Sequence, residues 1–166
     1  MIALIGILIT VASVAYGNAQ RKARDHQRKN DLETIRQALE LFYQENGYYP
    51  APDCSAGMFG GGFGEWSTGN DWLNYNSAVT GLNKLIGAGY LKKLPIDPIN
   101  VDSSPFSSAD NTFLYWYGCG AIFDNSDLNN LKATTYSLRA NLENNNDPQR
   151  NYNDTFFYSD YEVHNP

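Results

Sequence analysis

The sequence predicts an α+β fold in which a long N-terminal helix carries a small antiparallel β-sheet. An apolar run opens the chain, and apolar residues then recur at helical spacing between Gln20 and Gly47. Short aromatic and β-branched runs between turn residues dominate the second half of the chain. At 166 residues the chain is long enough for one sizeable core. We expect the apolar first half of the helix to protrude and its second half to pack on the sheet.

The net charge of −6 is unevenly distributed along the chain. Residues 1–50 contain six basic and five acidic residues, a net charge of +1, whereas residues 51–166 contain six basic and thirteen acidic residues, a net charge of −7. This balance argues against nonspecific nucleic-acid binding by the chain as a whole. We therefore divide the chain into an N-terminal helix, 1–50, and a globular head, 51–166.

The first segment, 1–19, is apolar, and Arg21 is the first charged residue. A secretory signal would carry basic residues in front of the apolar run, and a soluble core helix would show a polar face. A membrane span needs about 20 apolar residues to cross a hydrocarbon layer of about 30 Å. The sixteen residues Met1–Tyr16 would reach only about 24 Å as a helix, which is too short by about two turns. Taken alone, the positive-inside rule would place the acidic head in the cytoplasm, because basic residues follow the apolar run between Arg21 and Lys29. The resemblance described below implies the opposite orientation.

The second segment of the helix, 20–46, is amphipathic. Apolar residues at i, i+3, i+7 and i+10 form one stripe that we predict to enter the head core: Leu32, Ile35, Leu39 and Phe42. Gly47 and Pro50 are typical residues for ending the helix. The prediction is one helix of about 46 residues, roughly 69 Å long, with its weakest point at Gly17-Asn18.

Several segments carry a resemblance to a known family. The chain reads Ile-Ala-Leu-Ile-Gly-Ile-Leu at 2–8, Ala-Arg-Asp-His-Gln-Arg-Lys-Asn-Asp-Leu at 23–32 and Asn-Gly-Tyr-Tyr-Pro at 46–50. Residues 88–100 read Ala-Gly-Tyr-Leu-Lys-Lys-Leu-Pro-Ile-Asp-Pro-Ile-Asn. In this pattern the chain resembles the type IV pilins and the pseudopilins of type II secretion systems.

The resemblance implies a pilin-like fold and a structural role. Such subunits polymerise into a helical filament through the apolar helix, which lies in the cytoplasmic membrane before assembly with the head outside the cytoplasm. The implied partners are other copies of the chain, the pilus or secretion assembly machinery of that membrane, and a prepilin peptidase. The residues implied for the filament core or the membrane are Ile2, Leu4, Ile5, Ile7, Leu8, Ile9, Val11 and Val14.

The beginning of the chain departs from the family pattern. The family has a short basic leader ending in glycine, followed by Phe-Thr-Leu-Ile-Glu, and neither precedes Ile2 here. We therefore expect the native chain to begin upstream of Met1. The family's glutamate, which assists docking of subunits, has no counterpart in this sequence.

The head is predicted to hold one short helix and one antiparallel sheet. Residues 76–89 form the helix, with Val79, Leu82, Leu85 and Ile86 inward, and Pro95 and Pro98 lead out of it. The runs at 113–117, 134–140 and 155–161 are typical of strands.

Cys54 and Cys119 are the two cysteines of the chain. Outside the membrane an even pair favours a disulfide, which would close a loop of about 65 residues and contribute at most about 4 kcal/mol. Two unpaired buried thiols are the alternative.

Candidate sites for metals and catalysis are weak. Calcium is the one cofactor considered, with oxygen ligands from Asp124, Asp127, Asp147 and Asp154, but EF-hand spacing is absent and such residues also favour turns. His26 and His164 have no ligand spacing, and the glycines at 57–69 lack a nucleotide motif. We predict no catalytic residues and therefore no enzyme.

The sequence thus leads to one functional hypothesis and two alternatives. The leading hypothesis is a subunit of a type IV pilus-like extracellular filament that displays its head for adhesion, motility or DNA uptake. The first alternative is the major pseudopilin of a type II secretion system. The second is a membrane-anchored extracellular binding domain that does not polymerise.

Overall fold

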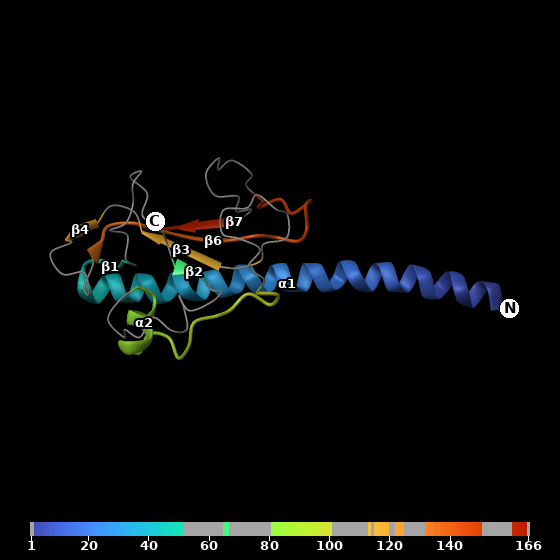
Figure 1. Ribbon diagram of the computed structural model, residues 1–166, viewed down its shortest axis with the longest axis horizontal. Coiled ribbons are helices and arrows are strands. Elements are labelled where there is room, and N and C mark those ends of the chain that lie inside the picture. Colours follow the sequence, from blue (N-terminus) through green and yellow to red (C-terminus); the bar gives the residue numbers. More distant parts are fainter. Residues whose placement is uncertain are drawn as a thin grey trace.

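The computed structural model describes residues 2–51, 65–66, 81–100, 113, 115–119, 122–124, 132–150 and 161–165. It contains a long N-terminal helix, α1, followed by a head of short strands and one short helix (Figure 1). The elements are α1 (Ile2–Asn46), β1 (Tyr49–Pro50), β2 (Glu65–Trp66), α2 (Asn83–Gly87), β3 (Tyr115–Cys119), β4 (Ile122–Asp124), β5 (Lys132–Ala133), β6 (Tyr136–Ala140) and β7 (Tyr161–His164). The predicted α+β class is confirmed.

Helix α1 is continuous over 45 residues, which corresponds to a length of about 68 Å. Its end follows from Gly47, which adopts a φ of 76° and donates its backbone N–H to the carbonyl oxygen of Tyr43 at 2.7 Å. A residue with a side chain is strained in this left-handed conformation, so glycine suits the position after the last helical residue.

The described strands form two antiparallel sheets, whereas the sequence predicted one. A four-stranded sheet has the order β2-β3-β6-β7, and a three-stranded sheet has the order β1-β5-β4. Strands β5 and β6 belong to different sheets although only Thr134 and Thr135 separate them, because the chain bends at Thr134. This change of direction has no counterpart in the apolar pattern, and the strand predicted over 134–140 therefore included Thr134 and Thr135, which precede β6.

The register of the larger sheet turns its apolar face toward α1. Strand β6 alternates buried and half-buried residues, and Tyr115 and Tyr117 of β3 are opposite Ala140 and Leu138. Strands β3 and β6 begin two residues later than predicted, and β3 also ends two residues later. Strand β7 begins at Tyr161, and the predicted strand residues 155–160 lie outside the described part of the chain.

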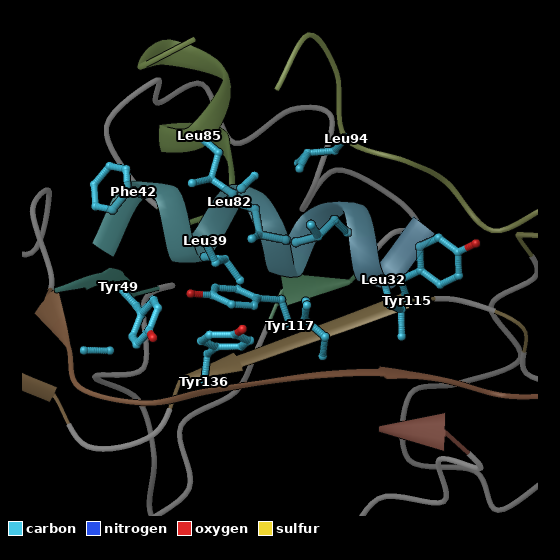
Figure 2. Close-up of a cluster of buried hydrophobic side chains, with 14 of the residues drawn as sticks. Leu32, Leu39, Phe42, Tyr49, Leu82, Leu85, Leu94, Tyr115, Tyr117 and Tyr136 are labelled. Atoms are coloured by element: carbon cyan, nitrogen blue, oxygen red, sulfur yellow. The ribbon is translucent and has the colours of Figure 1, made fainter. Parts of the chain in front are cut away.

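Helix α2 covers another side of α1. It is shorter than predicted, since the helix spans Asn83–Gly87, and residues 76–80, including Val79, lie outside the described residues. Figure 2 shows Leu82, Leu85 and Leu94 on one side of α1, with Tyr117 and Tyr136 on the opposite side. The second half of α1 therefore lies between two layers, and this position explains why its apolar stripe is fully buried.

The hydroxyls of three core tyrosines donate to carboxylates of α1, whereas that of Tyr117 donates to the carbonyl oxygen of Pro50. The hydroxyls of Tyr49 and Tyr136 both donate to Glu40, at 3.1 and 2.9 Å, and Tyr115 donates to Asp31 at 2.7 Å. Burial, together with these carboxylates, raises the pKa of each of the three phenols. The aromatic rings can therefore fill the core without leaving a buried hydroxyl unpaired.

Candidate functional site

The first half of α1 projects from the head (Figure 1). Ile5, Ile9 and Tyr16 have exposed fractions of 57%, 61% and 67%. The hydroxyl of Ser13 donates to the carbonyl oxygen of Ile9 at 2.8 Å, so this polar group is satisfied within the helix. Exposed apolar side chains grouped on one projecting element make this half of α1 a candidate interaction surface.

Two glycines lie in the same projecting half. A Cβ atom added at Gly6 or at Gly17 would meet nothing within 4 Å, and neither residue has a positive φ. Glycine in a helix interior costs about 1 kcal/mol relative to alanine. The fold of the single subunit therefore supplies no reason for glycine at either position.

A group of ion pairs, which we call the junction cluster, joins α1 to the head where the helix emerges. Its members are Arg24, Asp25, Arg28, Asp97 and Glu143. The side chain of Arg28 is completely buried, and it donates to Asp97 at 2.7 and 3.2 Å, to Asp25 at 2.8 Å and to Glu143 at 2.8 Å. Arg24 adds a bidentate pair with Glu143, at 2.7 and 2.5 Å.

Backbone donors complete the junction cluster. Asp25 accepts the N–H groups of Glu143 and Asn144, both at 2.9 Å, and Asp97 accepts that of Ile99 at 2.8 Å. The hydrogen bonds from Arg24 lower the pKa of Glu143, and those from Arg28 act in the same direction. Each buried carboxylate thus has several donors, the condition under which a buried ionic group is tolerated.

A second contact between α1 and the head is made by Lys29, one turn after Asp25. Lys29 donates to Asp147 at 2.7 Å and to Gln149 at 2.8 Å. Burial acts to raise the pKa of Asp147, but the hydrogen bond from Lys29 helps to lower it overall. Together with the junction cluster, this contact holds the loop after β6 along the helix.

The predicted site residues fall into three groups. Leu32, Ile35, Leu39 and Phe42 are buried, with exposed fractions of 3% or less. All eight predicted filament-core residues lie in α1, and two of them, Ile5 and Ile9, are exposed. The structure does not describe the side chains of the other six: Ile2, Leu4, Ile7, Leu8, Val11 and Val14. Cys119 ends β3, but Cys54 lies outside the described residues, so the disulfide stays a prediction.

Two of the four calcium candidates lie within the described residues, so calcium binding stays a prediction. Asp124 ends β4 and Asp147 is paired with Lys29, whereas Asp127 and Asp154 lie outside the described part. In the part of the chain that the structure describes, no group of three or more histidine, cysteine, aspartate or glutamate residues could hold a metal ion.

The sequence did contain a signal for the junction cluster that we did not use. Arg28 lies four residues before Leu32 and therefore continues the buried stripe of α1 toward the N-terminus. A charged residue in register with an apolar stripe indicates a buried ionic partner elsewhere. Its partners Asp97 and Glu143 are 69 and 115 residues away, and the sequence alone does not select them from the other acidic residues.

Comparison of the chain with protein-family models, with curated proteins and with solved structures finds no match. Within the residues that the structure describes, no helix combines the length and the apolarity needed to cross a membrane.

Proposed function

We propose that this chain is a structural subunit of a type IV pilus-like filament, which polymerises through the first half of α1 and displays its head for adhesion, motility or DNA uptake. The observation that carries the proposal is the projecting, apolar half of a helix whose other half is buried in the head. The resemblance of residues 2–50 to pilins and pseudopilins supports polymerisation as the use of this surface.

The exposed apolar residues of α1 need to be covered, by lipid before assembly and by other copies of the chain in the filament. Leaving one isoleucine side chain in water instead of burying it costs about 1.5–3 kcal/mol, and Ile5, Ile9 and Tyr16 are all more than half exposed. Helices from several copies can bury these side chains against one another along a filament axis. Before assembly the same segment is placed in the cytoplasmic membrane, with the head outside the cytoplasm.

The two glycines of the projecting half favour helix-to-helix contact. Small residues let helix backbones approach closely, and a contact of this kind would compensate the cost of glycine in a helix. Since the subunit's own fold leaves open space at Gly6 and Gly17, contacts between copies give a reason for them.

The junction cluster then fixes the orientation of each head relative to its own helix α1. Arg24 and Arg28 connect α1 to Asp97 and to Glu143, two separate segments of the head. A rotation of the head about α1 would break these buried bonds. The packing of the helices in a filament would therefore determine where each head lies on its surface.

Electron microscopy of sheared cell-surface material, with two matched variants, tests the proposal. Ile9→Asp places a charge on the projecting half, whereas Leu41→Asp places one at a residue of the same helix that lies beside the head and is 50% exposed. We expect filaments from the wild type and from Leu41→Asp, and none from Ile9→Asp, although all three heads remain folded.

Other outcomes lead away from the proposal. Normal filaments from Ile9→Asp would contradict polymerisation through α1. A wild-type chain that stays monomeric in detergent and gives no filaments would favour the membrane-anchored binding domain. Short filaments that remain within the cell envelope would favour the pseudopilin of a type II secretion system.

A further inference from the structure

We propose that a pocket beside the junction cluster binds the phosphate of an anionic phospholipid headgroup while the subunit is in the membrane. This inference rests on one part of the proposed function, the membrane-inserted stage of the projecting half of α1. It concerns different residues from those that bury the apolar surface, so the two can fail separately.

The pocket has a volume of about 520 Å³ and lies where α1 leaves the head. One wall is helical and the other is the loop that follows β6. Its lining residues are Asn18, Arg21, Lys22, Glu143, Asn144, Asn145 and Asn146. Positive side chains thus come from α1, and amide side chains come mainly from the loop.

The charges of the pocket favour an anion. Arg21 and Lys22 are exposed, and the structure gives them no ion-pair partner among the described residues. Glu143 is the acidic residue of the lining, but its carboxylate already accepts hydrogen bonds from Arg24 and Arg28. Two cationic groups therefore remain to bind a ligand.

The asparagines of the loop add hydrogen-bond donors. The side-chain oxygen of Asn144 accepts the backbone N–H of Asn146 at 3.3 Å, and that of Asn145 accepts a hydrogen bond from Arg150. With these oxygens in use, the amide NH₂ groups are what these two side chains offer a ligand. Cations together with N–H donors suit the oxygens of a phosphate.

The position of the pocket along α1 matches the headgroup layer. The polar layer on each side of a bilayer is about 5–8 Å thick, and aromatic residues favour its inner boundary. Arg21 and Lys22 lie five and six residues after Tyr16, about 8 and 9 Å along the helix axis. With Tyr16 at the boundary, their backbones lie at the outer edge of this layer, and their long side chains, which tilt toward the helix N-terminus, reach back to the phosphates.

The head also extends toward the membrane at this point. In Figure 1 the loop after β6, in orange, is the described part of the head that reaches furthest along α1 toward the N-terminus. An inserted subunit would bring this loop to the lipid surface before the rest of the described head. The pocket between loop and helix would then open among lipid headgroups.

Binding of the full-length chain to vesicles tests the inference. We compare phosphatidylcholine vesicles with vesicles that also contain phosphatidylglycerol, and measure bound protein by flotation. The test variant is Arg21→Gln with Lys22→Gln. The control is Lys92→Gln with Lys93→Gln, which removes the same charge from two exposed lysines of the head.

We expect the test variant to bind phosphatidylglycerol vesicles about 25-fold more weakly than the wild type, at about fivefold for each cation near an anionic surface. Binding to pure phosphatidylcholine should stay unchanged, and the control variant should retain the wild-type preference for phosphatidylglycerol. Circular dichroism should show the same helix content in all three proteins.

The alternative outcomes are distinguishable. An unchanged preference in the test variant, or equal losses in both variants, would overturn the headgroup site and leave the proposed function standing. A test variant that keeps the preference but no longer forms filaments would assign the cation pair to a second copy of the chain. A wild type that binds neither kind of vesicle would overturn the membrane stage itself.

Discussion

Replacing Arg28 by methionine should destabilise the protein far more than the same replacement at Arg36. Both arginines lie on α1, and each pairs with a carboxylate three residues before it, Asp25 and Glu33 respectively. They differ in their surroundings. The side chain of Arg28 is 0% exposed, whereas the side chains of Arg36 and Glu33 are 30% and 41% exposed.

The magnitude follows from what Arg28→Met leaves behind. Removing one partner of a buried ion pair costs about 3–5 kcal/mol, because the remaining charge stays buried without compensation. Asp25 would keep two backbone N–H donors, and so would Asp97, which accepts from Ile99 and Asn100. These donors limit the loss, so a value near 3 kcal/mol is expected for Arg28→Met, against at most about 1 kcal/mol for Arg36→Met.

Urea unfolding of the full-length chain in mild detergent, followed by near-ultraviolet circular dichroism, would measure both values. The two variants have the same change in side chain and net charge, so their difference isolates burial and the additional partners Asp97 and Glu143. Equal free energies of unfolding for the two variants would refute the reasoning. Such a result would mean that the junction cluster contributes no more than an exposed surface pair.

Three further predictions concern the head and the helix. Glu143→Gln should destabilise the protein by about 2 kcal/mol at neutral pH. Because the folded state lowers the pKa of Glu143, the difference in stability from the wild type should disappear as the pH falls below the ordinary range of a glutamate. A difference in urea unfolding that does not depend on pH would contradict this prediction. Gly47→Ala should lower stability by about 1 kcal/mol, because Gly47 has a φ of 76°, whereas Gly17→Ala should raise helix stability by up to about 1 kcal/mol. Thermal melts that rank the two variants in the opposite order would contradict this difference in backbone conformation between Gly47 and Gly17. Leu39→Ala should cost about 2–5 kcal/mol and Leu41→Ala less than about 0.5 kcal/mol, and equal losses on denaturation would argue against the burial of one residue and the exposure of the other.

The helix was predictable because its pattern is local and long. The stripe from Leu32 to Phe42 repeats over three turns, and Gly47 ends the helix by a conformational rule that depends on one residue. The sheet was less predictable. Strand β1, Tyr49–Pro50, has two residues and contains a proline, so alternation could not reveal it.

The junction cluster was missed for a different reason. An arginine on a helix is usually solvated, and the pattern of α1 gives no information on which distant carboxylate approaches it. The segment around Asp97 and the loop around Glu143 reach Arg28 only through the packing of the whole head. Long-range contacts between charged residues therefore required the structure.

The junction cluster also has a mechanical consequence. Within the described residues, Arg24 and Asp25 are the first side chains of α1, counted from the N-terminus, that bond to the head. Tension applied along the projecting half would be transmitted through an uninterrupted helix and would meet resistance first at this point. The bonds of Arg28 run to Asp97 and to Glu143 at the same level of the helix, so the two segments of the head would share the force. Separating the head from α1 would therefore require several of these contacts to break together.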